Sequence, residues 1–289
     1  MCSLPTPVPS SSSSARTWAP RGLALLGACA LLAGPLAAHD HWIAPSSFHP
    51  ALGARVDLRL CVGHPSQFEE QLRDPRRAVR FELLGASGAK PIVGLDGRSP
   101  AGFFTTRDPG CLVLVYQSNH ALAEIEPAKY AEYLESEGLE DVQHERERRG
   151  ETDLPGRDSY LRCDKALLSV GDRPADEHVD GYDTVVGLPI ELVLESDPAL
   201  WQPRDELVLR LELEGAPLAA RQVKLMRLTA PHTILLARTD EHGRARFTPD
   251  APDGWVASTV HQRRAKPEQA LEGDWEGLWA SLSFELRAR

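Results

Sequence analysis

The 289-residue sequence lacks the local motifs by which most enzyme classes are recognised. It contains no G-x-S-x-G nucleophile elbow, no P-loop, and no G-x-G-x-x-G motif between a predicted strand and a helix. An H-E-x-x-H zinc motif is also missing, because His144-Glu145 has no second histidine at the required spacing. We therefore predict no catalytic residues and no organic cofactor, and enzymatic activity stays an open alternative to a binding function.

Cysteine is scarce, and only Cys61, Cys111 and Cys163 follow position 38. No C-x-x-C pair occurs, which argues against a structural zinc site built from thiolates. An oxidising compartment would permit one disulfide and leave one thiol over. We prefer the pair Cys61 and Cys111, because both lie in strand-like runs.

Basic residues are outnumbered, with 32 Lys and Arg against 42 Asp and Glu. The first 38 residues hold two of the arginines and no acid, so the rest of the chain carries 30 basic and 42 acidic residues. An acidic surface of this kind argues against binding to nucleic acid or to anionic lipid.

Long apolar runs are absent except for one near the N-terminus. A short basic region precedes an Ala- and Leu-rich run at 23–36, and small residues follow as far as Ala38. This order is typical of a secretory signal peptide, and the run is shorter than the roughly 20 residues of a membrane-spanning helix. We predict a signal peptide at 1–38, no transmembrane segment in the mature chain, and a location in the periplasm or outside the cell. A lipoprotein with its lipid on Cys29 is a lesser alternative.

Apolar and polar residues alternate with period two along much of the chain, which is the pattern of half-buried strands. Turns rich in Gly or Pro separate these segments. The pattern predicts a mostly β protein with two β-sandwich domains of immunoglobulin or transthyretin type, at 39–173 and 186–289, joined by a linker at 174–185. The strand-like segments are 55–60, 79–83, 112–116, 190–194, 207–213, 223–228, 234–237, 255–260 and 282–286.

One region breaks the strand pattern. Pro127 suits the first position of a helix, apolar residues recur at helical spacing from Tyr130, and Gly138 is placed to end the helix. The highly charged segment 140–149 predicts a second short helix with a solvated face. We therefore expect a helical insertion at about 126–149 in the first sandwich.

Cleavage after Ala38 would make His39 the first residue of the mature chain, followed by Asp40 and His41. A free α-amine beside two imidazoles is a set of nitrogen donors that suits copper, nickel or zinc. In one geometry, a histidine at the third position closes square-planar rings through the amine and two amides. In another, the amine and imidazole of His39 chelate the metal and a third nitrogen comes from elsewhere in the fold.

His64 and His261 are candidates for that further nitrogen. His64 lies just after a predicted strand, where ligands are common, and His261 follows the strand at 255–260 and shares a face with Trp255. An ordinary loop histidine and a histidine packed beside Trp255 are the simpler alternatives. The predicted metal ligands are therefore His39, His41, His64 and His261. We place the other histidines on the surface: His49, His120, His144, His178, His232 and His242.

An ordered set of segments spans nearly the whole chain after position 38: Ala38-His39-Asp40-His41-Trp42, Gly63-His64-Pro65, 133–139, 157–165, 215–218, 239–243, 254–256, Val260-His261 and 274–279. Together these segments resemble a bacterial exported family of domains of unknown function whose members are described as nickel- or cobalt-transport periplasmic components of the NikM or NikK type. The resemblance implies a β-sandwich exported protein linked to uptake of a divalent metal. His39 fits the family pattern, whereas His41 stands where an aromatic or aliphatic residue is common and Asp158 where glutamate is usual.

The favoured interpretation is an exported periplasmic metal-binding protein, an accessory component that passes nickel, cobalt or copper to a membrane metal transporter. One alternative is a two-sandwich structural or ligand-binding module whose histidines have no specific metal. A less favoured alternative is a copper-dependent oxidoreductase, because an N-terminal histidine with a second imidazole is similar to the copper brace of lytic polysaccharide monooxygenases.

Overall fold

The computed structural model describes residues 39–171, 177–178, 180–269 and 271–287. The predicted signal peptide at 1–38, with Cys29, and part of the predicted linker lie outside the described residues. Strands dominate the described chain, so the predicted mostly β fold class with a helical insertion is confirmed. Within the described ranges, no helix combines the length and the apolar character needed to span a membrane.

A nine-stranded sheet forms the middle of the fold and joins strands from both predicted sandwiches. Its neighbouring strands are antiparallel except for one parallel pair, in which Trp275 lies opposite Asp158. In spatial order the strands are β14 (Ile234–Arg238), β13 (Gln222–Arg227), β16 (Gly254–Arg264), β17 (Trp275–Glu285), β9 (Gly156–Val170), β7 (Gly110–Ser118), β4 (Ala78–Gly85) and β5 (Gly88–Pro91), with β8 (Ala121–Ile125) paired to β9.

Two smaller sheets complete the β structure. The N-terminal sheet consists of β1 (Asp40–Pro45), β2 (Arg55–His64), β3 (Gln67–Gln71) and β6 (Gly102–Thr105). The C-terminal sheet consists of β10 (Ile190–Leu194), β11 (Leu207–Leu213), β12 (Ala216–Pro217) and β15 (Arg244–Phe247). A short 3₁₀ helix at Pro267–Gln269 precedes β17.

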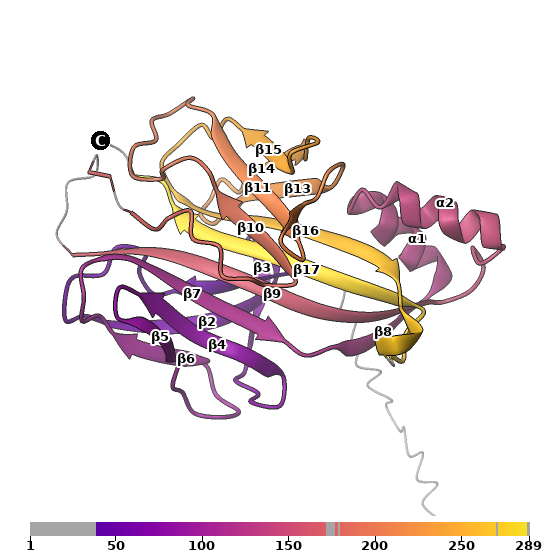
Figure 1. Ribbon diagram of the computed structural model, residues 1–289, viewed down its shortest axis with the longest axis horizontal. Coiled ribbons are helices and arrows are strands. Elements are labelled where there is room, and N and C mark those ends of the chain that lie inside the picture. Colours follow the sequence, from indigo (N-terminus) through magenta and orange to yellow (C-terminus); the bar gives the residue numbers. More distant parts are fainter. Residues whose placement is uncertain (1–38, 172–176, 179, 270, 288–289) are drawn as a thin grey trace, which may run out of the picture. The chain divides into compact units, whose positions relative to one another are not determined.

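Successive side chains of the long strands point to opposite faces of the large sheet, and both faces are packed against other strands. On β9, Cys163 and Leu167 pack with the C-terminal sheet, whereas Ala166 and Leu168 pack with the N-terminal sheet. Figure 1 shows β9, β16 and β17 running between the indigo N-terminal strands and the orange strands β10 and β11. Both sandwiches therefore share one central sheet, and the domain boundary at 174–185 stays a prediction.

The predicted helical insertion forms two helices, α1 (Pro127–Ser136) and α2 (Glu140–Arg149). Tyr130 and Leu134 are buried against the large sheet, in a cluster that includes Trp279. Gly150 ends α2 in the left-handed conformation that glycine adopts at low cost. The hairpin of helices is tied to β13 by an ion pair between Arg221 and Asp141.

The preferred disulfide between Cys61 and Cys111 is wrong, because all three described cysteines are free thiols. Cys61 packs beside Trp42, whereas Cys111 and Cys163 belong to the core under the C-terminal sheet. The strand-like runs were identified correctly, but the side chains are directed into different clusters. Burial raises the pKa of each thiol to about 12, so all three are neutral at physiological pH.

Candidate functional site

Strand β1 brings the first described residues onto the face of the large sheet that also carries α1. Its side chains alternate between two surroundings. Asp40 and Trp42 face β13 and β16, whereas His41 and Ile43 face β9 and the core of the N-terminal sheet. All four are buried, while His39 is exposed. Of the predicted N-terminal metal ligands, His39 therefore lies outside the core and His41 lies inside it.

His41 is enclosed, with 2% of its surface exposed, and both ring nitrogens have partners. Nδ1 lies 2.5 Å from Oδ2 of Asp164 on β9, and Nε2 lies 3.2 Å from Oε1 of Gln71. Asp164 also accepts a hydrogen bond of 2.7 Å from Ser281 on β17. Ligation of a metal by His41 would break at least one of these contacts, so the geometry favours a structural role for this imidazole.

Asp40 joins a second buried polar chain. It accepts a hydrogen bond of 2.5 Å from Ser258 and lies 2.8 Å from Nζ of Lys224, which also contacts Glu137 at 2.8 Å. Burial alone would lower the pKa of Lys224, but the two adjacent carboxylates outweigh burial and raise it. Asp40 is therefore committed to holding β1 against β13, β16 and the end of α1.

His39 lies one residue before β1, at the edge of this buried network. Its carbonyl oxygen accepts a hydrogen bond of 3.3 Å from the guanidinium of Arg162. Arg162 is itself buried on β9, and burial lowers its pKa. The backbone at His39 is thus anchored to the large sheet while its imidazole stays accessible to solvent.

His64 lies beside this point because of the pairing between β1 and β2. The antiparallel register places Asp40 opposite Gly63, so His39 and His64 are the next residues at this end of the two strands. Nδ1 of His64 lies 2.8 Å from Oγ of Ser66 and accepts a hydrogen bond of 3.3 Å from the amide of Ser66. Binding of a metal at Nε2 would move the ring proton to Nδ1, where Oγ of Ser66 could accept it. Burial, opposed by Asp40, lowers the pKa of His64, which favours the neutral, metal-binding imidazole.

His261 does not join this group. On β16, Ser258 faces Asp40, and His261 lies three residues further on, so strand alternation places it on the opposite face of the large sheet. Its Nδ1 is buried without a hydrogen-bond partner among the described residues, and burial lowers its pKa to about 4. Of the predicted set, His39 and His64 therefore lie at the same end of the paired strands β1 and β2, and His41 is buried within β1.

His232 is a neighbour of His64 that the sequence predicts only as a surface residue. It lies in the turn between β13 and β14, where its Nδ1 is 3.3 Å from the carbonyl oxygen of Arg227. It is near enough for its charge to lower the pKa of His64. No local sequence signal marks it, because the proximity depends on how β13 packs beside β1. Two other expected surface histidines are partly enclosed: His49, whose pKa burial lowers to about 4, and His120, which contacts Glu276 at 3.1 Å.

Within the described ranges, no group of three or more His, Cys, Asp or Glu side chains could hold a metal ion. A chain that begins at His39 would supply an α-amine at the same place, so His39 and His64 would together offer three nitrogen donors. Such a set fits copper, nickel and cobalt better than calcium or magnesium, which prefer oxygen ligands.

Comparison with solved structures finds weak similarities. A tetra-tandem repeat from the extending region of a large adhesion protein matches 86% of this chain with 11% identity and a TM-score of 0.21, and this chain spans 50% of that structure. The D0-D1 domain of intimin matches 85% of this chain and 97% of its own length, with 9% identity and a TM-score of 0.20.

No curated protein sequence matches the chain significantly. A family model described as "Domain of unknown function (DUF4198)" matches residues 36–263. This match covers well over half of the sequence and includes the whole of the His39–His64 region. The chain therefore belongs to the DUF4198 family.

Proposed function

We propose that the mature protein is an exported metal-binding protein whose site is built on its own N-terminus. The α-amine and imidazole of His39 would bind one divalent ion of nickel, cobalt or copper, and Nε2 of His64 would add a third nitrogen. The observation that supports this proposal is the register of β1 and β2, in which Asp40 lies opposite Gly63; continued by one residue, it would set His39 opposite His64.

The surroundings support a preformed site. Arg162 holds the carbonyl group of His39, and Ser66 fixes the ring of His64, so little freedom is lost when a metal binds. A site with an exposed side can also release its ion, as delivery to a membrane metal transporter would require.

The square-planar alternative, which uses the amides of Asp40 and His41, has less support. Those residues pair with Gly63 and Val62 in the β1–β2 ladder, and the imidazole of His41 contacts Asp164. Deprotonating both amides and turning His41 outward would dismantle the start of β1 and leave Asp164 without its imidazole partner.

Calorimetric titration of the mature protein with Ni(II), Co(II), Cu(II) and Zn(II) tests the proposal. We expect one tight site for at least one ion, and at least about 100-fold weaker binding in His39→Ala and in His64→Ala, since both remove a direct ligand. His242→Ala, which removes an exposed histidine in a distant turn, should bind as the natural protein does. Equal affinity in all four proteins would rule out this site.

A further inference from the structure

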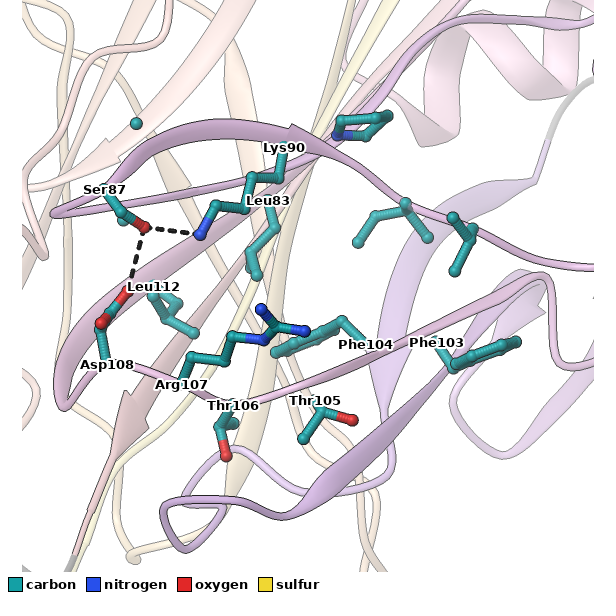
Figure 2. Close-up of a pocket in the computed structure, with 15 residues that line it drawn as sticks. Leu83, Ser87, Lys90, Phe103, Phe104, Thr105, Thr106, Arg107, Asp108 and Leu112 are labelled. Carbon is teal, nitrogen blue, oxygen red and sulfur yellow. Dashed lines mark hydrogen bonds between the residues drawn. The ribbon is translucent and has the colours of Figure 1, made fainter.

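A second feature lies away from the N-terminal histidines, in the first half of the chain. A cavity of about 280 Å³ opens between the β4–β5 hairpin and the segment that joins β6 to β7. Figure 2 shows Leu83 and Lys90 on one side of it and Phe104 and Arg107 on the other. Neither the proposed metal ligands nor the buried network around Asp40 line this cavity.

The walls of the cavity are largely apolar and well supported. Leu112 and Ile92 are buried in the core beneath the N-terminal sheet, and Phe104 packs against the same core. Phe103 is held from outside by the guanidinium of Arg55, which lies 3.8 Å from the centre of its ring. The space is therefore backed by the buried core and bounded by β4, β5, β6 and the segment after β6, and a largely apolar lining of this kind is usual in binding pockets for small molecules.

Two cationic side chains, Lys90 and Arg107, also line the cavity, and their contacts differ. Lys90 donates a hydrogen bond of 2.7 Å to Ser87, whose hydroxyl donates one of 3.0 Å to Asp108. Arg107 extends its guanidinium towards the interior of the pocket and forms no ion pair with a described residue (Figure 2). The pocket thus combines one unpaired guanidinium with one carboxylate at its rim.

We propose that this pocket binds a small monocarboxylate with an apolar body, whose carboxylate pairs with Arg107. A guanidinium presents two parallel donors that match a carboxylate, and the apolar walls would remove the body of the ligand from water. Asp108 disfavours a second negative charge, so a dicarboxylate or a phosphate fits less well. A cavity of about 150 Å³ is large enough for benzene, so this one accommodates a six- to eight-carbon acid.

Titration with sodium hexanoate, followed by backbone amide NMR shifts of residues 105–108, tests this site. We expect saturable binding with a Kd of about 1 mM or tighter, and much weaker binding of hexan-1-ol, which lacks the charge. Arg107→Gln should weaken hexanoate binding at least about tenfold, because a charge-assisted pair is lost. Arg98→Gln, an exposed arginine outside the pocket, should leave the Kd unchanged.

Three results would overturn the proposal: no saturation below about 10 mM, equal affinity for hexan-1-ol, or an unchanged Kd in Arg107→Gln. The preference for a single charge has its own check with heptanedioate, which should bind more weakly than hexanoate. Asp108→Asn should reduce that difference. If heptanedioate binds more tightly than hexanoate to the natural protein, Asp108 does not select against a second charge.

Discussion

Asp158 is a buried carboxyl group on β9 whose surroundings favour its neutral form. Burial raises its pKa to about 7, and the neighbouring side chain of Gln262 and amide of Gly277 offset only part of that effect. In the unfolded chain its pKa is near the ordinary 3.8. The folded protein therefore binds one more proton than the unfolded chain between about pH 4 and pH 7. The stability that this proton supplies is complete below pH 4 and is lost as the pH rises through 7.

Asp158→Asn keeps the shape of the neutral carboxyl group and cannot ionise. We expect the variant to exceed the natural protein in free energy of unfolding at pH 8, by up to about 4 kcal/mol for a shift of about three pKa units. The gap should close towards pH 4. Urea unfolding at pH 4, 6 and 8 measures this difference in the free energy of unfolding, and Asp153→Asn, at an exposed position, serves as the control. A difference that does not vary with pH would contradict the raised pKa.

His41 provides a second test at the residue scale, because the contacts of its two ring nitrogens favour a structural role over metal binding. His41→Phe would deprive buried Asp164 of its imidazole partner, and we expect a loss of about 3 kcal/mol in the free energy of unfolding. The affinity for metal should stay within about threefold of the natural value, since no ligand is removed. Loss of metal binding in a variant that remains folded would instead support the square-planar geometry.

At the scale of elements, a buried ion pair fastens β10 to β9. Lys165 lies 2.7 Å from Glu191, and 1% of each side chain is exposed. The carboxylate of Glu191 also accepts hydrogen bonds from the amides of Val186, Gly187 and Leu188. A single side chain thus ties the segment that enters the C-terminal sheet to the central sheet.

Glu191→Gln should lower the free energy of unfolding by about 3–5 kcal/mol, because it leaves the Lys165 ammonium buried without a counter-charge. Glu206→Gln breaks an exposed pair with Arg246 and should change stability by about 1 kcal/mol or less. Chemical denaturation of the three proteins gives both values. A loss in Glu191→Gln no larger than that in Glu206→Gln would show that the pair is not structurally important.

The sequence predicts about half of the described strands and misses β9, the longest one, for a physical reason. Its polar residues Arg162, Asp164 and Lys165 are buried beside partners on other strands, so they conceal the apolar alternation. Strand β17 was predicted only over 282–286, because its alternate residues include Ser281 and Ser283 on a buried face. A period-two pattern predicts a strand with one polar, exposed face and one apolar, buried face. It does not detect a strand whose buried face carries polar groups that are hydrogen-bonded inside the protein.

The whole molecule depends on strands that are distant in the sequence. The parallel pair of β9 and β17 brings residues 156–170 beside 275–285, and no local pattern specifies such a pairing. The same limit applies to the candidate site. His39 and His64 could be named from the sequence, whereas their place at the same end of two paired strands follows from the register of β1 and β2.

Because both sandwiches share the central sheet, we expect the mature protein to unfold in a single cooperative transition. Tryptophan fluorescence and far-UV circular dichroism should give coincident urea curves. A fragment of residues 186–289 should not fold alone, since it would expose the edge of β17 and the apolar residues that pack on β9. Two separate transitions, or a stable folded fragment, would contradict the shared sheet as the unit of stability.

The central functional claim is that the α-amine of His39 is itself a metal ligand. The most direct measurement compares the affinity of the protein that begins at His39 with that of a protein retaining Ala38, after mass analysis has verified both N-termini. The extra residue moves the amine away from the His39 imidazole and leaves every described side chain unchanged. We predict at least about 100-fold weaker binding of Ni(II), Co(II) or Cu(II) in the extended protein. Equal affinity in the two proteins would contradict the account.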